Sequence, residues 1–175
     1  EEGTLAAREY AAYVLSEISG LQCVPPTALR DGPFGIGSVQ IWIETTELDD
    51  FIEWAQSNDS RLRKLVLFDA IINNTDRKFG HILMSGEGFL YGCDHGVSFH
   101  SIPKLRTVLW QWAGQELTEE EKEILARVPK LNDRLKEYLS SEEIDALFAR
   151  SEEIVRAGTL PYPSDEWPAV PWPPF

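Results

Sequence analysis

The sequence has little cysteine, no long apolar run and a shortage of basic residues. Its two cysteines, Cys23 and Cys93, are too few and too isolated for a disulfide framework or a zinc ribbon. No apolar stretch approaches the roughly 20 residues that span a bilayer. The opening residues have neither the basic start nor the apolar run of a signal peptide. We therefore expect a protein of the reducing cytoplasm with no membrane span.

The charge balance narrows the range of partners. The chain has 29 Asp and Glu against 16 Lys and Arg, a formal net charge of −13. Nucleic-acid binding needs basic surface that displaces counterions, so no nucleic-acid partner is expected. Docking on anionic lipid is disfavoured for the same reason. The apolar fraction of 43% across 175 residues is typical of one globular domain with its own core.

Hydrophobic periodicity predicts an α+β fold with a few short strands and a mostly helical second half. The tail from 160 to 175 holds six of the eleven prolines and two Trp, so it is expected to lie irregularly against the domain surface. Helices are predicted over 5–19 with a stop at Gly20, from Glu47 through 55, over 61–72, and after capping boxes at Thr118 and Ser140; strands are predicted over 38–44, 82–84 and 89–91.

Two polar loops at the ends of the predicted hairpin hold most of the reactive side chains. Asp76 belongs to a run of six polar residues, 73–78, that precedes the first short strand, and Asp94 follows the second. Because a hairpin returns the chain to its starting point, we expect both carboxylates at the same end of it. Polar residues gathered between apolar runs are also expected to lie outside the core.

Two carboxylates in this relation suit phosphoryl transfer. One can orient the attacking hydroxyl or accept its proton, while the other holds Mg²⁺ against the nucleotide phosphates. A two-metal hydrolase is an alternative, with Asp76, His81, Asp94, His95 and His100 as candidate ligands. Against it, His95 directly follows Asp94, and neighbours on a strand point to opposite faces.

Residues 74–83 (NTDRKFGHIL), followed by 94–96 (DHG), resemble the catalytic and metal-binding loops of phosphatidylinositol-3/4-kinase-like proteins. Those loops read D-R-x-x-x-N and then D-x-G. Upstream, residues 8–13 (REYAAY) and 24–27 (VPPT) resemble the helix and following strand in the small lobe of that superfamily.

Over nearly its whole length the chain is more similar to an uncharacterised family of kinase-like proteins from actinobacteria, through residues 94–100 and 104–110. The resemblance implies a protein-kinase-like fold and an ATP- and metal-dependent phosphotransferase. The phosphate acceptor, a protein, a lipid headgroup or a small molecule, is left open. The implied layout is a single kinase-like domain over 1–175, with a small-lobe remnant and hinge over 1–44, a helical catalytic lobe over 45–160, and a Pro/Trp-rich tail over 161–175.

By this resemblance Asp76 and Arg77 are the catalytic residues, and Asp94 is the metal ligand. His81 stands where the second ligand, usually Asn, is found. Glu9 corresponds to the helix glutamate that pairs with the ATP-binding lysine. The hinge beside adenine corresponds to Ile41, Trp42, Ile43 and Glu44.

The sequence departs from the family pattern at two places. A histidine at position 81 suits Mn²⁺ better than Mg²⁺, which prefers oxygen ligands. No lysine precedes Glu9 in this sequence. The expected cofactors are therefore ATP with Mg²⁺ or Mn²⁺, and a pseudokinase or nucleotide-binding scaffold is the alternative.

Overall fold

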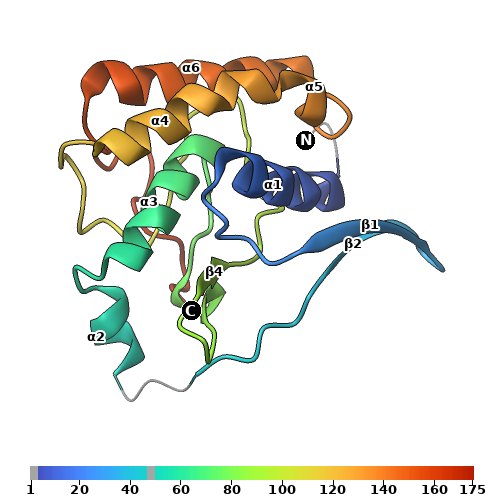
Figure 1. The fold of residues 1–175 in the computed structure, drawn as a ribbon, viewed down its shortest axis with the longest axis horizontal. Coiled ribbons are helices and arrows are strands. Elements are labelled where there is room, and N and C mark those ends of the chain that lie inside the picture. The colour runs from blue at the N-terminus through green and yellow to red at the C-terminus, as the bar shows by residue number, and fades with distance from the viewer. Residues whose placement is uncertain (1–3, 47–49) are drawn as a thin grey trace.

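The computed structural model describes residues 4–46 and 50–175 and has an α+β architecture (Figure 1). Two antiparallel pairs of strands lie beside a larger group of helices. The helices are α1 (Leu5–Ser19), α2 (Phe51–Ala55), α3 (Ser60–Ile72), α4 (Glu119–Arg127), α5 (Asn132–Leu135) and α6 (Ser141–Ala157), with 3₁₀ helices η1 (Phe79–His81) and η2 (Val128–Leu131). The strands are β1 (Thr27–Gly32) paired with β2 (Gly35–Gln40), and β3 (Ile82–Met84) paired with β4 (Leu90–Gly92).

Helix α1 has the boundaries that the sequence predicts, because both of its ends are capped locally. The Thr4 hydroxyl accepts a hydrogen bond from the Ala7 N–H at the first turn. Gly20 ends the helix with φ of 87°, a left-handed conformation that glycine adopts without a Cβ clash.

The capping boxes predicted at the starts of α4 and α6 are both present. In each box the glutamate also pairs with an arginine from another helix. Glu121 of α4 lies 2.7 Å from Arg63 Nε of α3, and Glu143 of α6 lies 2.7 Å from Arg8 Nη2 of α1. Each box therefore fixes its own helix and also joins it to a neighbouring one.

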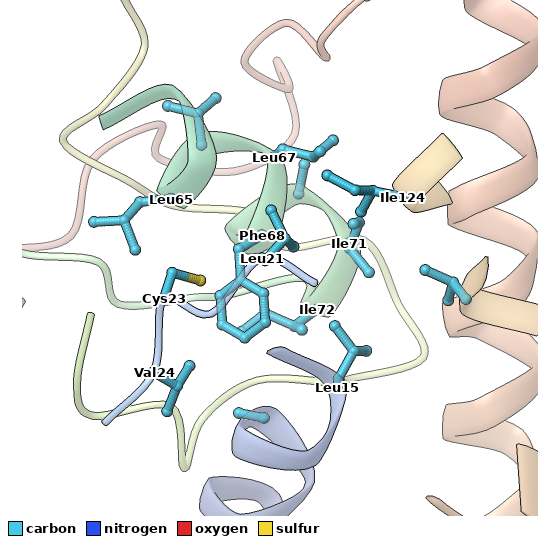
Figure 2. Packing of buried hydrophobic residues seen from close by; sticks show 14 of the residues in the cluster. Leu15, Leu21, Cys23, Val24, Leu65, Leu67, Phe68, Ile71, Ile72 and Ile124 are labelled. Carbon is cyan, nitrogen blue, oxygen red and sulfur yellow. The ribbon is translucent and has the colours of Figure 1, made fainter. Parts of the chain in front are cut away.

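Helix α3 is the centre of the hydrophobic core. From Leu65 to Ile72 all of its side chains are buried, as expected of a helix that is apolar on every side. Figure 2 shows Phe68, Ile71 and Ile72 of this helix among side chains from three other parts of the chain. Those neighbours are Leu15 of α1, Leu21, Cys23 and Val24 of the segment after α1, and Ile124 of α4.

The β1–β2 hairpin lies beside α1, and its turn extends beyond the helices (Figure 1). The sequence predicted a strand over 38–44, but β2 runs from Gly35 to Gln40, because Pro33 and Phe34 form a tight turn that lets Thr27–Gly32 pair with it. The alternation that suggested the later strand does not mark a buried face, since Val39 and Ile41 are 54% and 59% exposed.

Three other predicted elements can be compared with the structure. The helix expected from Glu47 is present as α2 from Phe51, and Glu47 and Leu48 lie outside the described residues. The second strand of the predicted hairpin is shifted by one residue, to Leu90–Gly92. The tail lies against the domain as predicted: the carbonyl of Ala169 accepts from Thr107 N–H, and Phe175 packs on Phe79 with ring centroids 5.4 Å apart.

Among the described residues, none of the helices combines the length and the apolar character needed to cross a bilayer.

Candidate functional site

Asp76, His81 and Asp94 come together at one end of the β3–β4 hairpin. Asp76 lies in the loop after α3, His81 ends η1, and Asp94 follows β4. Ile82 pairs with Gly92, so the residues just before β3 and just after β4 are neighbours. One ligand atom from each of the three side chains lies within 4.8 Å of the other two. The structure therefore places both carboxylates together, as the hairpin pattern predicted.

Asp94 has a backbone conformation that L-residues adopt infrequently. Its φ is 59°, in the left-handed region, which aspartate tolerates better than most side chains. Such positions persist where the surroundings fix them, and they cluster at functional sites. The carboxylate is 60% exposed and lies 3.4 Å from His81 Nε2. It is therefore accessible to an ion or a ligand from solvent.

Asp76 is held from both sides by residues of its own loop. The Asn74 side-chain oxygen accepts the Asp76 N–H at 3.0 Å. Lys78 Nζ lies 3.3 Å from Asp76 Oδ2 and balances part of its charge. Sequence reasoning did not single out Lys78, although a lysine two residues after the expected catalytic aspartate was a usable signal.

His81 offers a neutral imidazole to the site. Burial lowers the pKa of His81 below its ordinary value of 6.5, and the charge of Arg77 adds to that effect against the opposing carboxylates of Asp94 and Asp76. Its Nδ1 is buried and has no hydrogen-bond partner among residues 4–46 and 50–175, while Nε2 faces Asp94. Two carboxylates with one imidazole form a donor set that fits Mn²⁺ better than Mg²⁺.

Arg77 lies inside the core, so the expectation that this polar loop is outside the core is wrong for Asn73, Asn74 and Arg77. Arg77 and Asn74 are both 0% exposed. The Arg77 guanidinium donates to Asp69 of α3 at 2.8 Å from Nη2 and 3.0 Å from Nε. Its Nη1 donates to the carbonyls of His81 at 3.1 Å and Cys93 at 3.0 Å. The buried guanidinium of Arg77 therefore joins α3 to the residues on both sides of the hairpin.

The guanidinium fits because β4 has a glycine beside it. A Cβ on Gly92 would lie 2.7 Å from Arg77 Nη2 and 2.9 Å from Nη1. Asn74 closes the network from the other side, since its Nδ2 donates to Asp69 Oδ1 at 2.9 Å. A buried ion pair with this many hydrogen bonds has its polar groups satisfied, which the low-polarity interior requires.

His95 extends the network to the D-H-G loop. Its Nε2 lies 2.8 Å from Arg77 Nη2, and because arginine only donates, Nε2 is the acceptor. The ring proton is therefore on Nδ1, which faces Glu9 Oε2 at 3.8 Å. Burial lowers the pKa of His95, against the effect of Glu9, which agrees with a neutral ring.

Glu9 joins α1 to the same loop. Its Oε1 accepts the Gly96 N–H at 2.8 Å. Burial acts to raise the pKa of Glu9, but the interactions with His95 and Gly96 outweigh it and hold that pKa below 4.5. The partners of this carboxylate within the described chain are thus His95 and Gly96 of the D-H-G loop, where the family resemblance implies an ATP-binding lysine.

The five-ligand set of a two-metal hydrolase is not assembled. His95 is buried against Arg77. His100 Nδ1 accepts the Ile102 N–H at 3.0 Å, and its Nε2 lies 3.4 Å from Lys104 Nζ. Within the part of the chain that the structure describes, the candidate ligand cluster contains Asp76, His81 and Asp94 but neither of these histidines.

The expected hinge forms an irregular connection between the two pairs of strands. Ile41 N–H donates to the Pro26 carbonyl at 3.0 Å, next to β1. After the connection, Thr45 bridges to Ser85, beyond the end of β3. Its members are Ile41, Trp42, Ile43 and Glu44, and Ile41 and Trp42 are largely exposed.

A scan against protein-family models finds no match for this sequence. Among curated proteins, Protein Rv2133c of Mycobacterium tuberculosis (strain ATCC 25618 / H37Rv) is 34% identical over an alignment of 214 positions, which covers 99% of this chain and 77% of that protein. On this similarity over almost its whole length, the chain belongs to the same family as Protein Rv2133c.

Proposed function

We propose that this chain is a metal- and ATP-dependent phosphotransferase with a kinase-like fold of the phosphatidylinositol-3/4-kinase-like class. The observation that carries the proposal is the convergence of Asp76, His81 and Asp94, with ligand atoms within 4.8 Å of one another at the end of one hairpin. The D-R and D-x-G patterns in the same two loops support it.

In this proposal Asp76 orients the acceptor hydroxyl and takes its proton as the phosphoryl group is transferred. Lys78, 3.3 Å from Asp76, offsets negative charge where the phosphoryl group passes. Asp94 and His81 would hold a divalent ion, which when bound would offset negative charge on the nucleotide phosphates. Arg77 keeps the two loops in register through Asp69 and His95, so that the carboxylates are preorganised.

The same proposal assigns roles to the N-terminal part of the chain. Helix α1 and the β1–β2 hairpin represent the small-lobe remnant, and residues 41–44 provide backbone groups beside adenine. The two cysteines are free thiols, which accords with a reducing cytoplasm. Nucleotide and a phosphate acceptor are the partners.

A nucleotide-binding scaffold without turnover is the second candidate. It is favoured by the partners of Glu9, whose carboxylate is bound to Gly96 and lies near His95. If no lysine serves the nucleotide phosphates, binding can persist while phosphoryl transfer is lost.

Calorimetry of ATP binding with and without Mn²⁺ or Mg²⁺ tests the proposal on the full chain. We expect metal-dependent binding that Asp94→Asn abolishes and Asp76→Asn retains, with turnover in Asp76→Asn reduced by roughly 10²–10⁴-fold, as for loss of a general base. The control is Asp145→Asn, an exposed carboxylate on α6.

The outcomes separate the two candidates. Binding without any measurable turnover in the unmodified chain favours the scaffold. Absence of nucleotide binding with either ion contradicts both candidates.

A further inference from the structure

A basic cavity of about 280 Å³ lies beside the two loops of the site. The whole chain has a net charge of −13, yet none of the residues lining this cavity within the described ranges 4–46 and 50–175 is a carboxylate. Among the lining residues are Thr75, Ser98, His100, Lys104, Arg106 and Trp167.

Lys104 and Arg106 supply positive charge that no acidic side chain of the described chain contacts. Arg106 Nε donates to the Thr75 carbonyl at 2.7 Å, and its two Nη groups have no hydrogen-bond partner among the described residues. Lys104 Nζ lies 3.4 Å from His100 Nε2 and 4.9 Å from the centroid of the Trp167 ring. Both cations are therefore held in place, and each keeps N–H donors that no hydrogen bond to a described residue uses.

The third cation at the cavity, Arg8, is already compensated. Its guanidinium pairs with Glu143 at 2.7 Å. The charge that a ligand would meet thus comes from Lys104 and Arg106.

Ser98 contributes an unused hydroxyl. The residue is 1% exposed, and its Oγ is buried with no hydrogen-bond partner in the part of the chain that the structure describes. Buried polar atoms are usually satisfied, so an unpaired hydroxyl in the wall of a cavity calls for a partner. The neighbouring Thr75 hydroxyl is committed to the Val97 carbonyl at 2.7 Å, which fixes the wall itself.

We propose that this cavity binds the phosphate monoester of a small phosphorylated molecule. A dianion with several oxygens matches an arginine fork, an ammonium and a hydroxyl arranged around one space. The volume is near the lower end of the roughly 300–1,000 Å³ usual for ligand sites, which suits a small metabolite. A soluble ligand is favoured over a lipid headgroup, because the acidic chain is repelled from an anionic membrane.

The cavity adjoins the proposed active site through the chain itself. Thr75 immediately precedes Asp76, and Ser98 is two residues beyond Gly96 of the D-H-G loop. The bound molecule is the phosphate acceptor, an assignment that rests on the phosphotransferase proposed above. Binding at the cavity does not depend on that activity and can be measured without nucleotide.

The test is titration with glycerol 3-phosphate and with inorganic phosphate, followed by calorimetry in the absence of nucleotide and metal. Lys104→Gln and Arg106→Gln should each weaken binding by about tenfold, as expected for loss of a charge-assisted hydrogen bond. Lys130→Gln, which removes the same charge from an exposed position on η2, should leave binding unchanged. Because Arg106 also supports the loop through Thr75, Lys104→Gln is the decisive variant.

Three results would overturn the proposal. The first is no binding of either probe at millimolar concentration, or equal weakening by Lys104→Gln and Lys130→Gln. The second is displacement of glycerol 3-phosphate by a non-hydrolysable ATP analogue with Mn²⁺, which would assign the cavity to the nucleotide. The third is binding to vesicles containing phosphatidic acid that is lost in Lys104→Gln, with no binding of the soluble probes.

Failure of the phosphate-binding proposal and failure of the phosphotransferase proposal give different results. Phosphate binding without any nucleotide binding leaves the cavity in place and removes the phosphotransferase. Metal-dependent nucleotide binding without phosphate binding removes the cavity and leaves the phosphotransferase.

Discussion

Replacing Asp69 by Asn removes the negative charge of a carboxylate that is buried at the centre of the molecule. The Asp69 carboxylate accepts from Arg77 at 2.8 Å and 3.0 Å and from Asn74 at 2.9 Å. Both members of the ion pair have side chains that are 0% exposed. Asparagine keeps the shape of the side chain, so the variant leaves the Arg77 charge buried without a counterion.

The expected loss of stability is large. Removing one partner of a buried ion pair costs about 3–5 kcal/mol, because the remaining charge is uncompensated. A domain has a free energy of unfolding of about 5–15 kcal/mol in total, so the loss is a substantial fraction of it. For a chain of this size, about 3 kcal/mol lowers Tm by roughly 6–12 °C.

The assay is urea unfolding followed by circular dichroism. A double-mutant cycle of Asp69→Asn with Arg77→Met should show a double variant that loses less than the two single variants together, since the charge and its counterion leave at once. The control is Glu119→Gln, which removes a solvent-exposed pair with Lys122 and should cost far less stability than Asp69→Asn. A loss below about 1 kcal/mol in Asp69→Asn would refute the reasoning, because it would mean that water reaches the Arg77 charge.

Two further predictions concern the stability of the folded chain. Gly92→Ala introduces a Cβ that would lie 2.7 Å from the Arg77 guanidinium. We therefore expect the free energy of unfolding, measured in urea, to fall by about 1–3 kcal/mol. An unchanged free energy of unfolding would mean that the guanidinium moves aside. Burial acts to raise the pKa of Glu121, but Arg63 and the helix cap outweigh it and hold that pKa below 4.5. The ionised Glu121 carboxylate therefore stabilises the folded state at neutral pH, and this stabilisation is lost as pH falls through the lowered pKa. The difference in unfolding free energy between the unmodified chain and Glu121→Gln should shrink below pH 4.5, and a constant difference would contradict this.

Local signals were sufficient for most helices. The range of α1 follows from its apolar spacing and from Gly20, which needs the left-handed conformation. The starts of α4 and α6 follow from capping boxes, whose hydrogen bonds span three residues. The strand predicted over 38–44 failed because alternation alone does not say whether a face is covered, and on this hairpin Val39 and Ile41 face solvent.

At the site, the sequence predicted the meeting of Asp76 and Asp94 because a short hairpin relates them. It did not predict the buried position of Arg77, since a run of polar residues is normally solvated. One signal was present: Asp69 lies within the apolar helix 65–72, and an acid there requires a cationic partner. The basic cavity could not be predicted from the sequence. It depends on the contact between Arg106 and Thr75, which are 31 residues apart, and no local pattern specifies that contact.

The position of Arg77 also bears on how the molecule opens. Its Nη1 donates to a carbonyl on each side of the hairpin, at His81 and Cys93, while its other nitrogens donate to Asp69 on α3. Neither loop can detach without breaking the contacts that hold the other one, and the guanidinium cannot shed its charge to ease the separation. The two loops should therefore open as one cooperative unit, and hydrogen exchange of the amides in both should report a common free energy of opening.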